Sequence, residues 1–100
     1  MSFISVEPEA MAASAATMTG LGAQMAATST AAAAPTMGII PPGLEETSAL
    51  LAASLSTHGA IYQAAAAVAD FVHQMAAVNL ATNGVGYEAV DIAAATGALL

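Results

Sequence analysis

The sequence predicts an all-α fold, an antiparallel hairpin of two helices, from the placement of its alanine, proline and large apolar residues. Two alanine-rich segments flank a stretch, 35–43, that holds three prolines and two glycines. Prolines cannot lie inside a continuing helix, so this stretch predicts a connector. In both flanking segments the apolar residues recur at helical spacing, which predicts helices over 8–34 and 45–82. One hundred residues is the length of a single domain.

The first helix is predicted to begin at Pro8. Proline suits a first helical turn, and the carboxylates of Glu7 and Glu9 are favourable at the positive end of the helix dipole. The spacing along this helix predicts a narrow a/d seam, in which small residues allow close approach and flexible thioethers fill gaps. Its members at seven-residue intervals are Met11, Met18, Met25 and Ala32, with Ser14, Leu21 and Thr28 between them.

The second helix is predicted to open at Glu45 and Glu46 and to end near Thr82, with Asn83-Gly84 as a C-terminal cap. Its apolar arc is roughly 220° wide, whereas a helix in a lone two-helix hairpin needs a stripe nearer about 100°. A polar face remains at Ser56, Gln63, Asp70 and Gln74. Half of the apolar arc therefore lacks a partner within the chain, and exposed apolar surface of this extent marks an interface.

We expect a second chain to cover that surface. The residues that we predict to contact it are Leu51, Leu55, Ile61, Tyr62, Val68, Phe71, Val72, Met75 and Val78.

The charge pattern limits the classes of partner. Seven acidic residues face no Lys or Arg, which gives a net charge of −7. Without cations the chain cannot neutralise phosphates or attach electrostatically to anionic lipid, so neither nucleic acid nor a charged membrane surface is an expected partner. The basic n-region of a secretory signal peptide is also missing. The most apolar window, 61–81, contains five polar residues, and we expect no stable membrane span.

No catalytic, cofactor or metal site is predicted. The chain has no cysteine, and His58 and His73 lie too far apart on one helix to ligate the same metal. Asp70 and His73, at i and i+3, can form a hydrogen-bonded pair, but no nucleophile accompanies them. The glycines of Gly84-Val-Gly86 are too few for a phosphate loop and predict a flexible hinge instead.

Several features together resemble the mycobacterial PE family. They are Pro8-Glu9 near the amino terminus, an alanine-rich body of about 100 residues without Cys, Lys or Arg, and a connector that contains a Pro-Pro pair. The sequence Tyr87-Glu-Ala-Val-Asp91 fits a Tyr-x-x-x-Asp/Glu element. The resemblance implies that Tyr87 and Asp91 form a type VII (ESX) secretion signal in a C-terminal tail, 84–100, after a helical hairpin, 1–83.

The same resemblance implies a partner. A PPE-family protein would complete a four-helix bundle with the two helices of this chain, and a cytoplasmic secretion chaperone would bind the PPE protein rather than this chain. Assembly in the cytoplasm would precede export to the cell surface or the medium, where the pair would act at the surface or in host interaction. The alternative is a self-associating cell-envelope or membrane-active helical protein. A small hydrolase would require His73 to act with a serine, and we expect no such activity.

Overall fold

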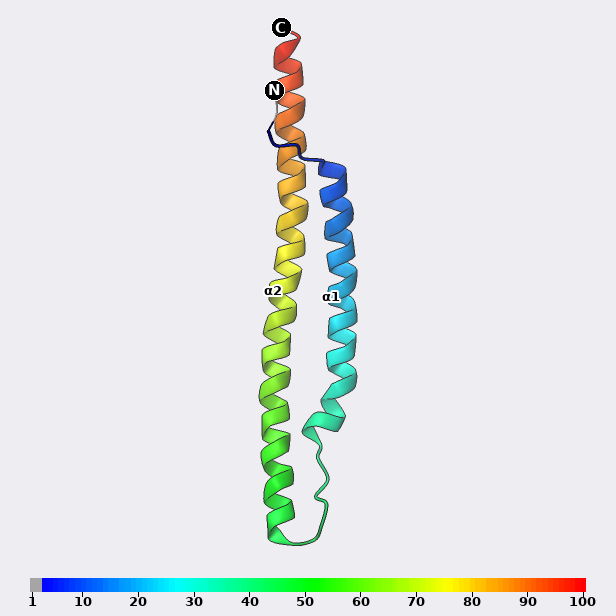
Figure 1. The fold of residues 1–100 in the computed structure, drawn as a ribbon, viewed down its shortest axis with the longest axis vertical. Helices are drawn as coiled ribbons and strands as arrows, with labels where there is room; N and C mark the ends of the chain where they lie inside the picture. The colour runs from blue at the N-terminus through cyan, green and yellow to red at the C-terminus, as the bar shows by residue number, and fades with distance from the viewer. Residues whose placement is uncertain (1–2) are drawn as a thin grey trace. The chain divides into compact units, whose positions relative to one another are not determined.

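The computed structural model describes residues 3–100 and contains two helices, α1 (Pro8–Met37) and α2 (Glu46–Ala98). The chain divides into two compact units, one made of Met1–Leu21 and His73–Leu100 and the other of Gly22–Val72. In each unit a stretch of α1 lies alongside an antiparallel stretch of α2 (Figure 1). The all-α hairpin predicted from the sequence is confirmed.

The start of α1 is as predicted, but the seam on α1 is displaced. Pro8 is the first helical residue, and the carbonyl of Glu7 accepts a hydrogen bond from the amide of Met11 at 3.1 Å. Met11, Met18 and Ala32 are half-buried as expected, whereas Met25 is exposed and its neighbour Ala26 is half-buried instead. The other inward positions up to residue 29 are Ala15, Gly22 and Ser29, and the predicted Ser14, Leu21 and Thr28 are exposed. A straight helix has 3.6 residues per turn, so a strict seven-residue repeat drifts away from the contact.

The end of α1 also differs from the prediction, because α1 includes Pro35 and continues to Met37. Pro35 lies in the last turn, where it removes only one amide donor. The hydroxyl of Thr36 donates to the carbonyl of Ala32 at 2.6 Å, and the amide of Gly38 donates to Ala34 at 2.9 Å. The bond to Ala34 satisfies one of the last four carbonyls of α1, which would otherwise be unpaired at the helix end. Figure 1 shows this last turn tilting toward α2, as expected beside a proline.

The face of α2 that lies against α1 is made of small and polar residues, with Leu80 as its one large apolar residue. Half-buried or buried positions recur every three or four residues, and we call them the α1-facing row. In the unit Gly22–Val72 they are Ala52, Ser56, Gly59, Gln63, Ala66 and Asp70, and in the other unit they are His73, Ala77, Leu80 and Gly84. Ser48, Gln74 and Ala81, beside the row, are also buried or half-buried. The most buried apolar side chains among residues 3–100 are all alanines, namely Ala15, Ala52 and Ala77.

This orientation corrects the expectation that half of the apolar arc of α2 packs on α1. The polar face predicted at Ser56, Gln63 and Asp70 is the face that packs, because small or short side chains let the two backbones approach. At Gly59, an added Cβ would overlap the backbone carbonyl of Thr36 and lie 2.7 Å from its carbon. Ser56 Oγ accepts a hydrogen bond from the amide of Ile39 at 3.2 Å, which ties the connector to the same face.

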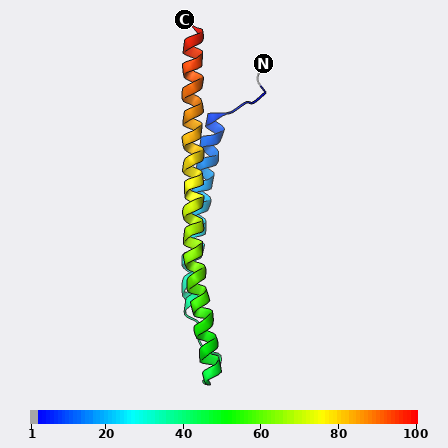
Figure 2. The same ribbon diagram turned by 90° about the vertical axis from the view of Figure 1, so that its left-hand side faces the viewer.

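The predicted helix end at Thr82 and the hinge at Gly84–Gly86 are wrong. The α2 helix continues through Asn83 and Gly84 to Ala98, as Figures 1 and 2 both show. Described glycines have no positive φ, so Gly84 does not form a left-handed cap. Its role is packing instead: a Cβ on Gly84 would come within 3.3 Å of Met11 Cβ and 3.4 Å of the carbonyl oxygen of Pro8.

Candidate partner interface and signal segment

The nine residues predicted to contact a partner form the apolar face of α2, and all nine are exposed. Their exposed fractions run from 43% at Met75 to 66% at Phe71. None of them belongs to the α1-facing row, so packing on α1 leaves them free. The arrangement can bind an apolar surface on another molecule, because burial of each large side chain contributes about 1.5–3 kcal/mol.

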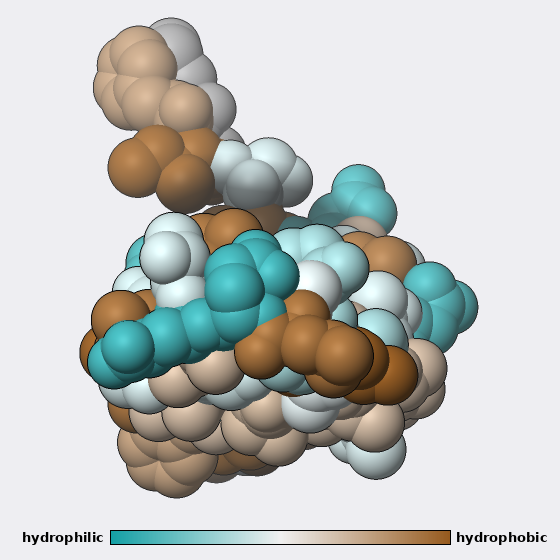
Figure 3. Space-filling model, turned by 90° about the horizontal axis from the view of Figure 1, so that it is seen from below, coloured by the Kyte–Doolittle hydropathy of each residue, from teal (hydrophilic) through white to brown (hydrophobic). Residues whose placement is uncertain are grey.

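Further apolar surface was missed by the sequence analysis. Leu21 and Met25 on α1 are 48% and 41% exposed, because the displaced seam turns them outward. Ile40 and Leu44, in the connector, are also exposed. Figure 3 views the connector end, where hydrophobic surface lies directly beside hydrophilic surface. The run of prolines there gave no periodic signal from which these residues could be found.

Tyr87 and Asp91 both lie on α2, in the unit that contains the amino-terminal residues. Because the segment is helical, a spacing of four places the two side chains on one face. Both are exposed, Tyr87 to 49%. Tyr87 follows Gly84 by three residues and Asp91 follows Tyr87 by four, so the pair continues the spacing of the α1-facing row. An aromatic ring and a carboxylate are thus exposed together on one side of α2.

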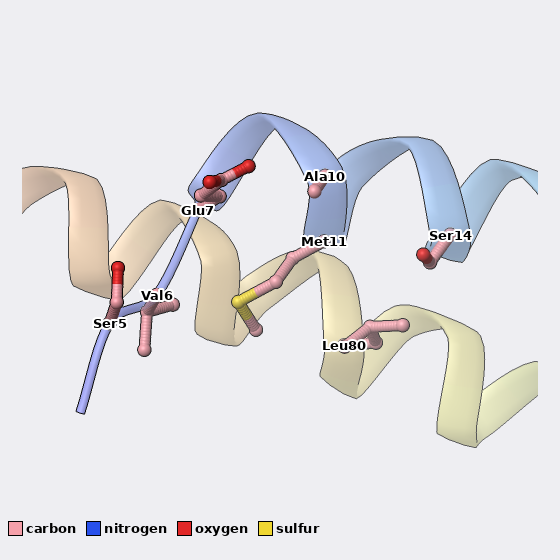
Figure 4. A pocket seen from close by; sticks show the side chains of 7 residues that line it. All are labelled: Ser5, Val6, Glu7, Ala10, Met11, Ser14 and Leu80. Atoms are coloured by element: carbon pink, nitrogen blue, oxygen red, sulfur yellow. The ribbon is translucent and has the colours of Figure 1, made fainter. Parts of the chain in front are cut away.

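The amino-terminal end of α1 forms two open depressions with α2. Met11 and Leu80, from α1 and α2, are among seven residues that line one of them, of about 490 Å³ (Figure 4). The other, of about 370 Å³, is lined by Pro8 and by three carboxylate residues, Glu7, Glu9 and Glu88. The Pro8-Glu9 motif therefore lies close to Glu88, which follows Tyr87 directly, with negative charge around it.

Asp70 and His73 do not form the hydrogen-bonded pair that their spacing in the sequence allows. His73 Nε2 donates to the carbonyl oxygen of Met18 at 2.7 Å, which fixes the ring against α1. Asp70 Oδ1 is buried and has no hydrogen-bond partner among residues 3–100. His58 is exposed. No group of three or more His, Cys, Asp or Glu suited to a metal ion occurs in the part of the chain that the structure describes.

Among residues 3–100, one helix, α2, meets the length and composition of a membrane span. The most apolar 18-residue window of α2 has a mean hydropathy of 1.2, and 6% of that window is buried in the structure. By length and composition alone, α2 could cross a bilayer.

Comparison with known proteins identifies the family. The model of the PE family matches residues 4–94. The chain belongs to the PE family. Among its relatives, PE family protein PE13 of Mycobacterium tuberculosis H37Rv is 42% identical over 98% of this chain and 99% of PE13. PE family protein PE8 of the same strain is 47% identical over 75% of the chain, but that match spans 27% of PE8.

A PE-PGRS protein gives a similar result. PE_PGRS3 of Mycobacterium tuberculosis CDC 1551 is 38% identical over 94% of the chain, which corresponds to 10% of its own length. The chain thus matches nearly all of PE13 and a minor part of these two longer PE relatives.

Proposed function

We propose that this PE protein is the non-catalytic subunit of a heterodimer with a PPE-family protein. The observation that carries the proposal is the apolar face of α2, whose large side chains are all exposed while the α1-facing row buries mainly alanine and glycine. A hairpin with so little buried apolar area gains little stability from its own packing. A partner that covers the apolar face would supply the missing burial and complete a four-helix bundle.

The same geometry supports a role for the C-terminal segment in export by a type VII (ESX) system. Tyr87 and Asp91 are exposed on one face of α2. They continue the line of the α1-facing row past the point where α1 begins, so α1 does not cover them. A receptor can therefore contact the ring and the carboxylate at once. In this proposal the heterodimer assembles in the cytoplasm, a chaperone binds the partner, and the pair acts at the cell surface or on the host.

The heterodimer is tested by size-exclusion chromatography with light scattering and by circular dichroism. The chain alone should be poorly folded or aggregated, and co-expression with the matching PPE protein should yield a soluble helical 1:1 complex. A stable helical monomer without a partner would contradict the proposal, because the apolar face would then need no cover.

Export is tested separately in a mycobacterial host by measuring the chain in the culture medium and cell-surface fraction. Tyr87→Ala should abolish export while the protein still accumulates in the cytoplasm with its partner. Val90→Ala is the matched control, since Val90 is exposed on the same segment but lies outside the Tyr87–Asp91 pair. Equal export of both variants would show that Tyr87 is not part of the signal.

The second candidate is a self-associating or membrane-active envelope protein, favoured by the length and hydropathy of α2. It predicts a stable homodimer, or insertion into neutral phosphatidylcholine vesicles, by the chain without any PPE protein. Light scattering and vesicle flotation on the same preparation distinguish this outcome from the heterodimer. The net charge of −7 without any cation makes anionic vesicles a suitable negative control.

A further inference from the structure

The helical C-terminal segment carries a second regular row of apolar residues. Within the unit that contains His73–Leu100, positions three and four residues apart on α2 share an exposed side of the helix. We call this set the outer row: Met75, Val78, Thr82, Val85, Ala89, Ile92 and Thr96. At about 100° per residue its centre is roughly 140° from that of His73, Ala77, Leu80 and Gly84, so α1 does not compete for it.

The outer row has the spacing of a helix–helix contact. Alternating steps of three and four residues place a/d knobs along one line, which is the pattern that a neighbouring helix meets. The residues beside the row include Ala81, Gly86 and Ala93, which are small enough to let another backbone come close. The row crosses Gly84–Gly86 without a break, because α2 itself is unbroken there.

The two threonines in the middle and at the end of the row are compatible with burial. Thr82 Oγ1 donates to the carbonyl of Val78 at 2.9 Å, and Thr96 Oγ1 donates to Ile92 at 2.9 Å. Their hydroxyls are therefore satisfied within α2, and their methyl groups remain to contact a neighbour. A covering helix would leave no unpaired hydroxyl at these positions, which removes the usual penalty for burying a polar group.

Charge defines the chemistry of the covering helix. Glu88 directly precedes Ala89 of the outer row, and it shares a depression with Glu7 and Glu9 at the start of α1. The chain has no Lys or Arg to balance this acidic group. A helix with an apolar a/d seam and a Lys or Arg opposite Glu88 is complementary in both shape and charge.

We infer that the partner-binding surface extends along α2 through residues 85–96, so that the C-terminal segment is part of the docking surface and not a free tail. The occupant is a helix of the PPE partner with an apolar seam and a basic residue facing Glu88, and the inference rests on the proposed heterodimer. Tyr87 and Asp91 lie roughly 170° and 150° from the centre of the outer row. Docking therefore leaves the signal pair uncovered and holds its helix in place.

Hydrogen exchange of the intact chain, alone and in the co-expressed complex, tests the inference. Amides in 85–96 should exchange at least about tenfold more slowly in the complex, because opening of an exposed terminal helix requires little free energy until a partner covers it. Protection of 61–78 with no change in 85–96 would overturn the inference while the proposed heterodimer stood. Failure to form any complex with PPE proteins would overturn both.

A matched pair of variants provides the second measurement. Val85, in the outer row, and Val90, outside it, are the same residue type on the same segment and are both 66% exposed. Val85→Asp should weaken binding of the PPE partner by at least about tenfold, since it buries an unpaired charge, whereas Val90→Asp should change Kd by less than about twofold. Both changes lower helix propensity equally, so equal effects of the two variants on Kd would contradict docking on the outer row.

Discussion

The two sides of α2 differ in the size of their side chains. Apart from Leu80, the α1-facing row contains glycine, alanine and polar residues, and its buried members are alanine and glycine. The apolar face holds leucine, isoleucine, phenylalanine, valine and methionine, all exposed. Small residues bring two backbones together but bury little area, and large residues supply most of the free energy of burial. The hairpin is therefore built for close contact within the chain, and its largest apolar side chains stay exposed.

The largest effect is expected from a change that separates the helices. Gly59→Ala would place a methyl group on the backbone carbonyl of Thr36, which cannot move away as a side chain could. We expect it to lower the free energy of unfolding of the assembled protein by about 3 kcal/mol. Thermal unfolding followed by circular dichroism measures this change.

Gly20→Ala, in the interior of α1, is the control, because nothing lies within 4 Å of a Cβ at that position. Alanine there should stabilise α1 by about 0.5–1 kcal/mol, since it removes the entropic penalty of a helical glycine. Opposite signs for the two variants would confirm the close contact at Gly59. A stabilising Gly59→Ala would show that the helices do not approach there.

The apolar face is tested at its most exposed aromatic residue. Phe71→Ala should weaken the heterodimer by about 2 kcal/mol, roughly thirtyfold in Kd, because a buried aromatic side chain is a typical hot spot. Phe3→Ala removes an equally large ring that is 93% exposed outside both helices, and it should leave Kd unchanged. Isothermal titration or surface plasmon resonance distinguishes the two, and a larger loss for Phe3 would place the interface elsewhere.

Asp70 tests how a buried polar group in the α1-facing row affects the stability of the protein. Its buried Oδ1 lacks a partner among residues 3–100, and an unsatisfied buried oxygen destabilises a fold by about 1–3 kcal/mol. Asp70→Ala should therefore raise the free energy of unfolding by about 1 kcal/mol more than Asp91→Ala, which makes the same change in helix propensity at an exposed position. Chemical denaturation of the two complexes measures the difference. An equal effect would show that Asp70 is paired in the assembled protein.

Helix existence and the connector followed from the sequence because prolines and alanines act locally. The nine contact residues were also predicted to be uncovered within the chain, and their exposure agrees. What could not be predicted was which side of α2 packs on α1. A helical wheel ranks sides by hydrophobicity, whereas here the choice follows from size: Gly59, Gly84 and Ala77 permit a backbone distance that Phe71 or Met75 would prevent.

The continuation of α2 to Ala98 was missed for a related reason. Asn83-Gly84 has the composition of a C-terminal cap, and from sequence alone a glycine used for packing is indistinguishable from one used for a turn. The contact with Pro8 and Met11 comes from residues more than seventy positions earlier, so no local pattern reveals it. For the same reason, the hydrogen bond of His73 to the carbonyl of Met18, instead of to Asp70, could not be predicted from the sequence around His73.

The smallest effect is expected at the first turn of α2, where Ser48 is buried and donates a hydrogen bond to the Glu45 carboxylate. This bond, with a further backbone hydrogen bond, holds the pKa of Glu45 below 4.5. Because the folded pKa is lowered, the stabilisation is present above about pH 4.5 and is lost as the pH falls through the folded pKa.

Ser48→Ala should therefore reduce stability near neutral pH, and the difference from wild type should disappear in acid. Unfolding of the two proteins across this range measures it, and NMR titration of Glu45 should show its pKa returning toward 4.5. Ser54→Ala, at an exposed serine of the same helix, should show no such pH dependence. A difference between Ser48→Ala and wild type that persists in acid would mean that Ser48 acts through packing beside the α1-facing row and not through the carboxylate.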